Sequence, residues 1–214
     1  IENTRLPEGY VPIKGVRSTG LEWVNTRCEC FKETRIVCDA LLPSDGNSSG
    51  TLFGIEPSGL YNGVYVANEP SSPLKFDILA RRKSGSVSIT SSMASNRAWI
   101  DLSCGDPEGS PVRFVTGWTA WPYDDKEKPQ ALMGLRTEPL VIFGRNVSTE
   151  HSDVTDLCSA TVYSFRIYRG AELQRDLVPC VNKTNREKNE VGFYDRVEGV
   201  FLGNSGKGGL QIGR

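Results

Sequence analysis

The stretch YSFRIYRG at residues 163–170 alternates apolar with more polar side chains and ends in a turn signal. Successive side chains of a β-strand point to opposite faces, so this alternation predicts a half-buried strand. We expect Tyr163, Phe165 and Ile167 to share the core side of that strand. Arg169 and Gly170 then form a connection short enough for a tight hairpin into the apolar run that follows.

The same alternation recurs along the chain, at residues 24–30, 36–40, 64–66, 76–78, 87–89 and 100–104. No stretch of about 12 residues shows a helical 3.6-residue period. The 22 Gly and 12 Pro supply turns between the short apolar stretches. Without a composition shift or a fixed repeat, we expect residues 1–214 to form one all-β sandwich domain.

Composition excludes several classes of protein. The 214 residues are 38% hydrophobic and 24% charged, as in a globular chain, and 25 Lys+Arg nearly balance 26 Asp+Glu. This balance argues against a dedicated nucleic-acid binder, which usually carries a basic surplus. No run reaches the roughly 18 apolar residues of a membrane helix, so we expect no membrane insertion. We expect this chain to be the mature part of an exported precursor whose leader has been removed.

Four groups of residues, in chain order, resemble motifs found in a large set of bacterial and phage surface domains. LPEGY at residues 6–10 and STGLEWVNT at 18–26 resemble LPxGY…STGTQYIDT, and PLVIFGRN at 139–146 resembles PLYLFARN. YSFRIY at 163–168 and LQRDLVPC at 173–180 resemble YSFKIYxxGxLVRDFVPC. GFYD at 192–195 and FLGNSG at 201–206 resemble GLYDxVxxxFYxNxGTG. The chain is therefore similar to the laminin-G-like, concanavalin A-like group.

This resemblance implies a concanavalin A-like jelly-roll sandwich of two antiparallel sheets, one of them concave. It also implies a place on secreted or cell-surface proteins, with a presumed role in binding glycans or proteins. It supplies no set of functional residues, because the matched motifs look structural. Phe165 and Ile167 would fill a core, Gly170 would turn a hairpin, and the Asp195 carboxylate would cap a turn.

The acidic residues and the cysteines show no clear pattern of a metal site. Calcium is common in laminin-G-like domains, and Asp124, Asp125, Asp153 and Asp156 are possible donors, but they show no ligand spacing. We expect no cofactor, with calcium as the open alternative. Zinc is disfavoured because Cys28-x-Cys30 has no second ligand pair and His151 is the single histidine. Six cysteines, Cys28, Cys30, Cys38, Cys104, Cys158 and Cys180, are expected to be mostly buried thiols, although the first three could form a disulfide.

Catalysis has weak support. A retaining glycosidase needs two carboxylates about 5–5.5 Å apart, which on a strand would give a Glu-x-Asp-x-x-Glu run, and no such run occurs. No Gly-x-Ser-x-Gly elbow or phosphate-binding loop is present. We therefore expect no enzyme activity and keep a glycoside hydrolase as the least favoured alternative.

The best candidate binding residues lie in GWTAWPYDD at residues 117–125. Aromatic rings stack on the apolar faces of sugars, while carboxylates accept hydrogen bonds from hydroxyl groups. Trp118, Trp121, Tyr123, Asp124 and Asp125 would supply both kinds of group. In the competing interpretation, Trp118 or Trp121 closes one end of the sandwich core, since tryptophan is usually buried.

The function predicted from the sequence is a non-catalytic binding module of a secreted or cell-surface protein. We expect its partner to be a glycan or a surface protein, with glycan recognition preferred. The nearly neutral charge also suits an uncharged ligand such as a neutral glycan. The main alternative is a structural or protein-interaction domain without a sugar site.

Overall fold

The computed structural model describes residues 5–30, 33–42, 50–55, 62–67, 75–82, 85–92, 97–103, 113–116, 119–121, 139–147, 153–184 and 188–214. Within these, the backbone alone is described for residues 62–67, 75–82, 85–92, 102–103, 113–116 and 119–121. Every regular element in these ranges is a strand, and none of the described residues forms a helix able to cross a membrane. The predicted all-β class is confirmed.

The larger sheet is built around β15, and its strands are listed here in the order of pairing. They are β11 (Thr119–Trp121), β10 (Arg113–Thr116), β9 (Arg97–Ser103), β4 (Thr34–Leu41), β15 (Ser159–Arg169), β16 (Glu172–Asn182), β17 (Glu190–Asp195) and β18 (Val200–Leu202). Three short strands join this sheet: β1 (Tyr10–Pro12) on β16, β2 (Gly15–Thr19) on β15, and β19 (Gln211–Gly213) on β2.

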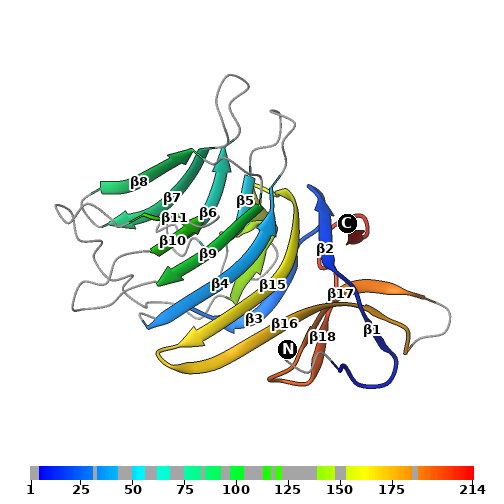
Figure 1. Cartoon of the computed structure of the whole chain (residues 1–214). Helices are drawn as coiled ribbons and strands as arrows, with labels where there is room; N and C mark the ends of the chain where they lie inside the picture. The colour runs from blue at the N-terminus through cyan, green and yellow to red at the C-terminus, as the bar shows by residue number, and fades with distance from the viewer. Residues whose placement is uncertain are drawn as a thin grey trace.

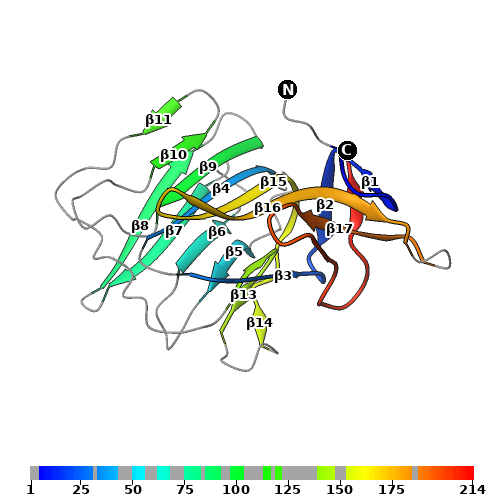
Figure 2. The same ribbon diagram turned by 90° about the horizontal axis from the view of Figure 1, so that it is seen from below.

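The second sheet runs from β14 (Val154–Thr155) through β13 (Arg145–Asn146), β5 (Gly50–Ile55), β6 (Asn62–Ala67) and β7 (Lys75–Arg82) to β8 (Gly85–Ser92). β12 (Pro139–Ile142) pairs with both β5 and β3 (Val24–Glu29). In Figure 2 the two sheets are seen as two layers, with β10, β9, β4 and β15 in one and β8, β7, β6 and β5 in the other. Figure 1 shows β1, β2 and β17 at the end of the molecule opposite β8.

The core between the layers consists of the side chains that the alternation places inward. Ile36, Cys38 and Ala40 of β4 are buried, as predicted. The rings of Phe53 on β5 and Phe165 on β15 meet edge to face with centroids 5.3 Å apart, which joins the two sheets directly. Such a pair contributes about 0.5–1.5 kcal/mol beyond the burial of its area.

The hairpin between β15 and β16 forms as predicted. Arg169 pairs with Glu172, and Gly170 adopts a φ of 58°, a left-handed conformation that costs glycine little. The predicted cap also forms, because Asp195 Oδ1 accepts hydrogen bonds from the backbone amides of Val197 (3.0 Å) and Asp176 (3.1 Å).

The predicted orientation of Tyr163 is wrong, because β15 contains a β-bulge at this residue. The register between β15 and β4 shifts between Val162 and Ser164, so Tyr163 is an extra residue on the bulged strand. Val162 and Phe165 point into the core, but Tyr163 is only partly buried and its ring packs under Arg97. Tyr163 therefore does not share the core side of β15 with Phe165 and Ile167.

The second sheet is not wholly antiparallel, because β13 runs parallel to β5. The chain reverses direction between β12 and β13 at Phe143, whose φ is 66°. A left-handed conformation costs a residue other than glycine about 1–3 kcal/mol. Full burial of the Phe143 ring and a 2.7 Å hydrogen bond from its amide to the carbonyl of Leu52 offset that cost.

Candidate functional site

Most of the binding residues predicted from the sequence lie outside the described residues. These are Trp118, Tyr123, Asp124 and Asp125. The single histidine, His151, also lies outside the described residues. The backbone of Trp121 is described, and it ends β11 opposite Phe114 of β10. Trp121 is therefore part of an edge strand of the larger sheet rather than of a loop, and the binding role of these residues stays a prediction.

The described part of the chain contains no group of three or more His, Cys, Asp or Glu side chains that could hold a metal ion. Of the suggested calcium donors, Asp156 is paired with Arg145, whose Nη2 lies 2.7 Å from Asp156 Oδ2. Asp153 uses its backbone carbonyl to accept a 3.0 Å hydrogen bond from the amide of Val147.

The buried cysteines are thiols rather than disulfides. Cys28, Cys38, Cys158 and Cys180 are unbridged, while Cys104 lies outside the described residues. Burial raises the pKa of Cys158 to about 12. Burial also raises the pKa of Cys180 to about 12, although a backbone hydrogen bond acts in the opposite direction. Thiols of this kind are protonated at neutral pH and do not act as nucleophiles.

The most distinctive exposed feature is the outer face of the larger sheet over β9, β4 and β15. Trp99 at the centre of β9 is 43% exposed, whereas its chain neighbours Ala98 and Ile100 are buried. Arg97 and Asp101 share the outward face of β9 with Trp99, and Asp39 of β4 lies directly opposite it in the ladder. A large indole thus lies among charged side chains on a strand that is apolar on its other face.

Two ion pairs cross the β4–β9 ladder on either side of Trp99. Arg97 donates to Asp39 through Nε (3.0 Å) and Nη2 (2.8 Å). Arg35 donates to Asp101 through Nε (2.7 Å) and Nη2 (2.6 Å). Each carboxylate is thus held by both oxygens in the two-point geometry that fixes the orientation of both partners.

Both arginines also lie over tyrosine rings of β15. The Cζ atom of Arg97 is 4.5 Å from the ring centroid of Tyr163, and that of Arg35 is 5.4 Å from the centroid of Tyr168. The bulge that moves Tyr163 off the core side therefore supplies one of these two supports. We call Trp99, Arg97, Asp39, Arg35, Asp101, Tyr163 and Tyr168 the Trp99 platform.

The electrostatics of the Trp99 platform are balanced. Its two guanidinium groups and two carboxylates sum to no net charge. Hydrogen bonding to Asp101 raises the pKa of Arg35, and hydrogen bonding to Asp39 raises that of Arg97. Both arginine side chains are therefore permanent cations, and each is paired with an aspartate of the neighbouring strand.

The size and chemistry of the platform match those of a flat, hydroxyl-rich ligand. From Arg97 to Asp101, β9 spans about 13 Å, and the three strands are about 10 Å across. The indole offers an apolar surface, and each carboxylate oxygen has a second lone pair beyond the one used by its arginine. Stacking and hydroxyl recognition can thus occur on the same surface.

The sequence contains a signal for the platform in the stretch that forms β9. Residues 97–101 read RAWID, in which Arg97, Trp99 and Asp101 alternate with the apolar core residues. Tryptophan on the polar side of an alternating strand is unusual, because its area favours burial. The pairing with Asp39 and Arg35 could not be read from the sequence, since it depends on the register between β4 and β9.

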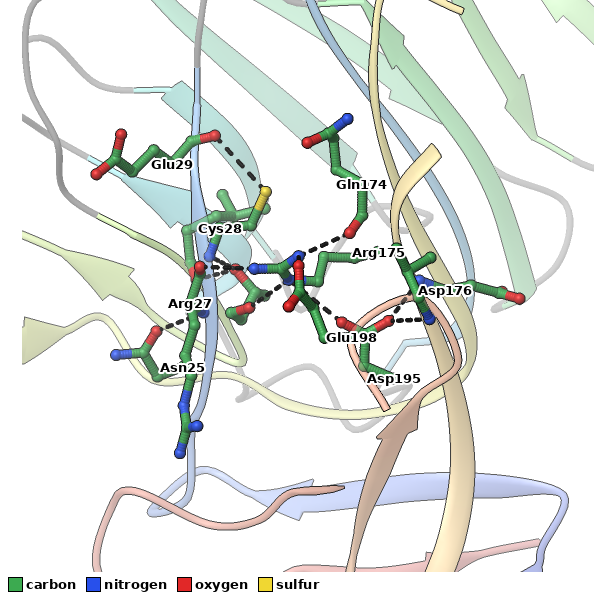
Figure 3. Close-up of polar contacts among 12 residues, drawn as sticks. Asn25, Arg27, Cys28, Glu29, Gln174, Arg175, Asp176, Asp195 and Glu198 are labelled. Atoms are coloured by element: carbon green, nitrogen blue, oxygen red, sulfur yellow. Dashed lines mark hydrogen bonds and ion pairs between the residues drawn. The ribbon is translucent and has the colours of Figure 1, made fainter. Parts of the chain in front are cut away.

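A second arginine cluster lies where β16 and β17 meet β3, and Figure 3 shows Arg175 reaching from β16 toward Arg27 of β3. Arg175 donates from Nε to the carbonyl of Thr26 (3.1 Å) and from Nη2 to that of Arg27 (2.9 Å). Its Nη1 donates to Glu198 Oε1 (2.8 Å), and its Nε lies 3.3 Å from Asp195 Oδ2.

This cluster, which we call the Arg175 corner, is built into the fold. Asp195 is completely buried, and the side chain of Arg175 is only 13% exposed. Arg27 adopts a φ of 53°, and the bond from Arg175 to its carbonyl fixes the chain at that point. The corner links the two sheets and leaves little surface for a ligand.

Comparison of the chain with family models, with curated proteins and with solved structures gives no match.

Proposed function

We propose that the protein is a non-catalytic binding module of a secreted or cell-surface protein, and that it recognises a glycan through the Trp99 platform. The observation that carries the proposal is the exposed indole of Trp99 between two Arg–Asp pairs. Aromatic rings and planar polar side chains together suit sugars, which present C–H faces and rings of hydroxyls. The ordered motifs from residue 6 to residue 206 add support for a concanavalin A-like jelly roll.

The sheet, not the 117–125 segment, is the site we favour, because its side chains are fixed by ion pairs and ring contacts. Sites on strands are more precise than sites on loops. The predicted residues Trp118 and Trp121 remain a second candidate, and Trp121 ends β11, which pairs with β10 in the same sheet. Unchanged sugar affinity in both Trp118→Ala and Trp121→Ala would reject that segment as the binding site.

A protein-interaction role is the main alternative. Exposed tryptophan and arginine are also the residues that dominate protein interfaces. A glycan array covering host mucin, plant and microbial sugars separates the two roles. Binding of at least one glycan is expected. If no glycan on the array binds at millimolar concentration, glycan recognition is rejected.

The decisive variant is Trp99→Ala, with Ile212→Ala as its matched control. Ile212 of β19 is an exposed apolar side chain, 56% accessible, on a strand that pairs with β2 rather than with the platform strands. Loss of indole stacking, worth about 1.4–2.8 kcal/mol, should weaken glycan binding by about 10- to 100-fold. Ile212→Ala should leave the affinity unchanged.

A further inference from the structure

We infer that the Trp99 platform selects neutral glycans and discriminates against carboxylated or sulfated ones. This inference rests on the proposed function, since it names the class of sugar that the proposed site would accept. It starts from the observation that the positive groups at the centre of the platform are already engaged by carboxylates of the same protein.

One two-point edge of each guanidinium group is already occupied by an aspartate. Arg35 uses Nε and Nη2 on Asp101, and Arg97 uses the same two atoms on Asp39. A carboxylate or sulfate on the ligand would compete with Asp101 and Asp39 for these donors. An exchange of this kind would leave Asp101 or Asp39 without its arginine beside the incoming anion, and the repulsion between the two negative charges disfavours it.

The two aspartates are also less exposed than their arginines. Side-chain exposure is 14% for Asp39 and 19% for Asp101, against 59% for Arg97 and 45% for Arg35. An anion stacked on Trp99 would therefore approach two partly buried carboxylates of like charge. Like charges at short range repel each other most strongly where water is excluded.

Neutral hydroxyl groups meet no such obstacle. Each oxygen of Asp39 and Asp101 accepts one hydrogen bond from its arginine and keeps a lone pair for another donor. Neighbouring hydroxyls of a pyranose ring can donate to these lone pairs while the ion pairs stay intact. The Arg–Asp pairs then act as oriented acceptors beside the stacking surface.

The next charges on the same face belong to Arg166, Asp176 and Arg196. Arg166 lies opposite Val37 in the β15–β4 ladder, and Val37 lies opposite Asp101. Arg166 Nε donates to Asp176 Oδ1 (3.0 Å), and Arg196 Nε donates to Asp176 Oδ2 (2.6 Å). Both cations share one carboxylate, so this group is engaged internally as well, although it carries one surplus positive charge.

The test uses neutral hexasaccharides of glucose, mannose and galactose, each beside a form whose primary hydroxyls have been oxidised to carboxylates. Calorimetry on the wild-type protein should show binding of at least one neutral form. The oxidised counterpart should bind at least tenfold more weakly, because its carboxylates face Asp39 and Asp101.

Asp101→Asn sharpens the test, because it removes one charge and keeps the shape of the side chain. We expect it to weaken binding of the neutral form and to narrow the gap to the oxidised form, since Arg35 becomes available to the ligand carboxylate. Asp156→Asn is the matched control: it breaks the Arg145–Asp156 pair away from the platform, where Asp156 has a φ of 50° that asparagine tolerates. It should leave both affinities unchanged.

The outcomes separate the inference from the proposed function. Equal or tighter binding of the oxidised forms, abolished by Trp99→Ala, overturns neutral selectivity and leaves glycan binding at the platform standing. An unchanged gap in Asp101→Asn also overturns the inference. Failure of every neutral and oxidised form, together with an empty glycan array, rejects the proposed function itself.

Discussion

The Trp99 platform and the Arg175 corner use the same chemical unit, an arginine beside an aspartate, in opposite ways. At the corner, Arg175 is 13% exposed and donates to two backbone carbonyls of β3 as well as to Glu198. On the platform, Arg35 and Arg97 are 45% and 59% exposed and donate to aspartate side chains. The aspartate at the corner is fully buried, while those of the platform reach solvent.

The Arg175 corner therefore stabilises the fold, whereas the Trp99 platform presents side chains at the surface. The carbonyls of Thr26 and Arg27 depend on Arg175 for these bonds, and removing it would leave polar groups without partners. The platform pairs join side chains on neighbouring strands whose backbone ladder is already complete. Their loss would change the surface while the sheet remains.

The largest expected effect comes from Arg175→Met. The substitution leaves the buried carboxylate of Asp195 uncompensated and removes the bonds to β3, so the free energy of unfolding should fall by about 3–5 kcal/mol. Urea denaturation followed by circular dichroism measures this loss. Arg175→Lys keeps the charge without the planar guanidinium group, so its free energy of unfolding should lie between those of Arg175→Met and the wild type. A loss below about 1 kcal/mol for Arg175→Met would contradict the clamp assigned to the corner.

Alkaline pH should lower the stability of the protein through its buried thiols and leave the glycan affinity of the platform nearly unchanged. The pKa of Cys158 is raised from 9.0 to about 12, so the unfolded chain loses this proton at lower pH than the folded protein does. Stability is therefore retained below pH 9 and falls as pH rises from about 9 toward 12, by about 2 kcal/mol for one such thiol near pH 10.5.

Denaturation at a series of alkaline pH values measures this slope, and Cys158→Ala should reduce it by the contribution of this one thiol, since Cys180 keeps its own raised pKa. Glycan affinity of the folded protein should change little over the lower part of this range, because hydrogen bonding to Asp101 and Asp39 raises the pKa of Arg35 and of Arg97 and keeps both side chains charged. A Cys158→Ala protein with the wild-type slope would show that burial of this thiol is not the cause.

The smallest expected effect on stability is that of Arg97→Ala. An exposed ion pair contributes at most about 1 kcal/mol, so the free energy of unfolding should change by less than that amount. Glycan binding should nevertheless weaken about tenfold, because Asp39 loses the partner that orients it beside Trp99. A stability loss like that of Arg175→Met, with unchanged binding, would reverse the roles assigned to the two regions.

The fold was more predictable from the sequence than the site. Alternation identified Ile36, Cys38 and Phe165 as core residues because each strand of a sandwich must bury one face. The outward position of Tyr163 was missed, since a bulge depends on the partner strand and not on local pattern. The turn at Phe143 was missed for a similar reason: tertiary packing holds a left-handed residue that its sequence does not favour.

The site was harder because its parts come from distant positions. Trp99 meets Asp39 only through the register of β9 with β4, about 60 residues apart along the chain. Without that register, the sequence shows Trp99 and Asp39 as two unrelated residues. Clustered aromatics in the sequence instead point to residues 117–125, whose binding role remains a prediction, while the single exposed tryptophan of RAWID carries no such local signal.

One measurement tests the central claim most directly: titration calorimetry of a neutral oligosaccharide selected on the array, against wild-type protein and Trp99→Ala. The account predicts a measurable, stoichiometric affinity for the wild type, a 10- to 100-fold weaker one for Trp99→Ala at unchanged stability, and no change for Ile212→Ala. Equal affinities for the wild type and Trp99→Ala would contradict the assignment of glycan binding to the outer face of β9, β4 and β15.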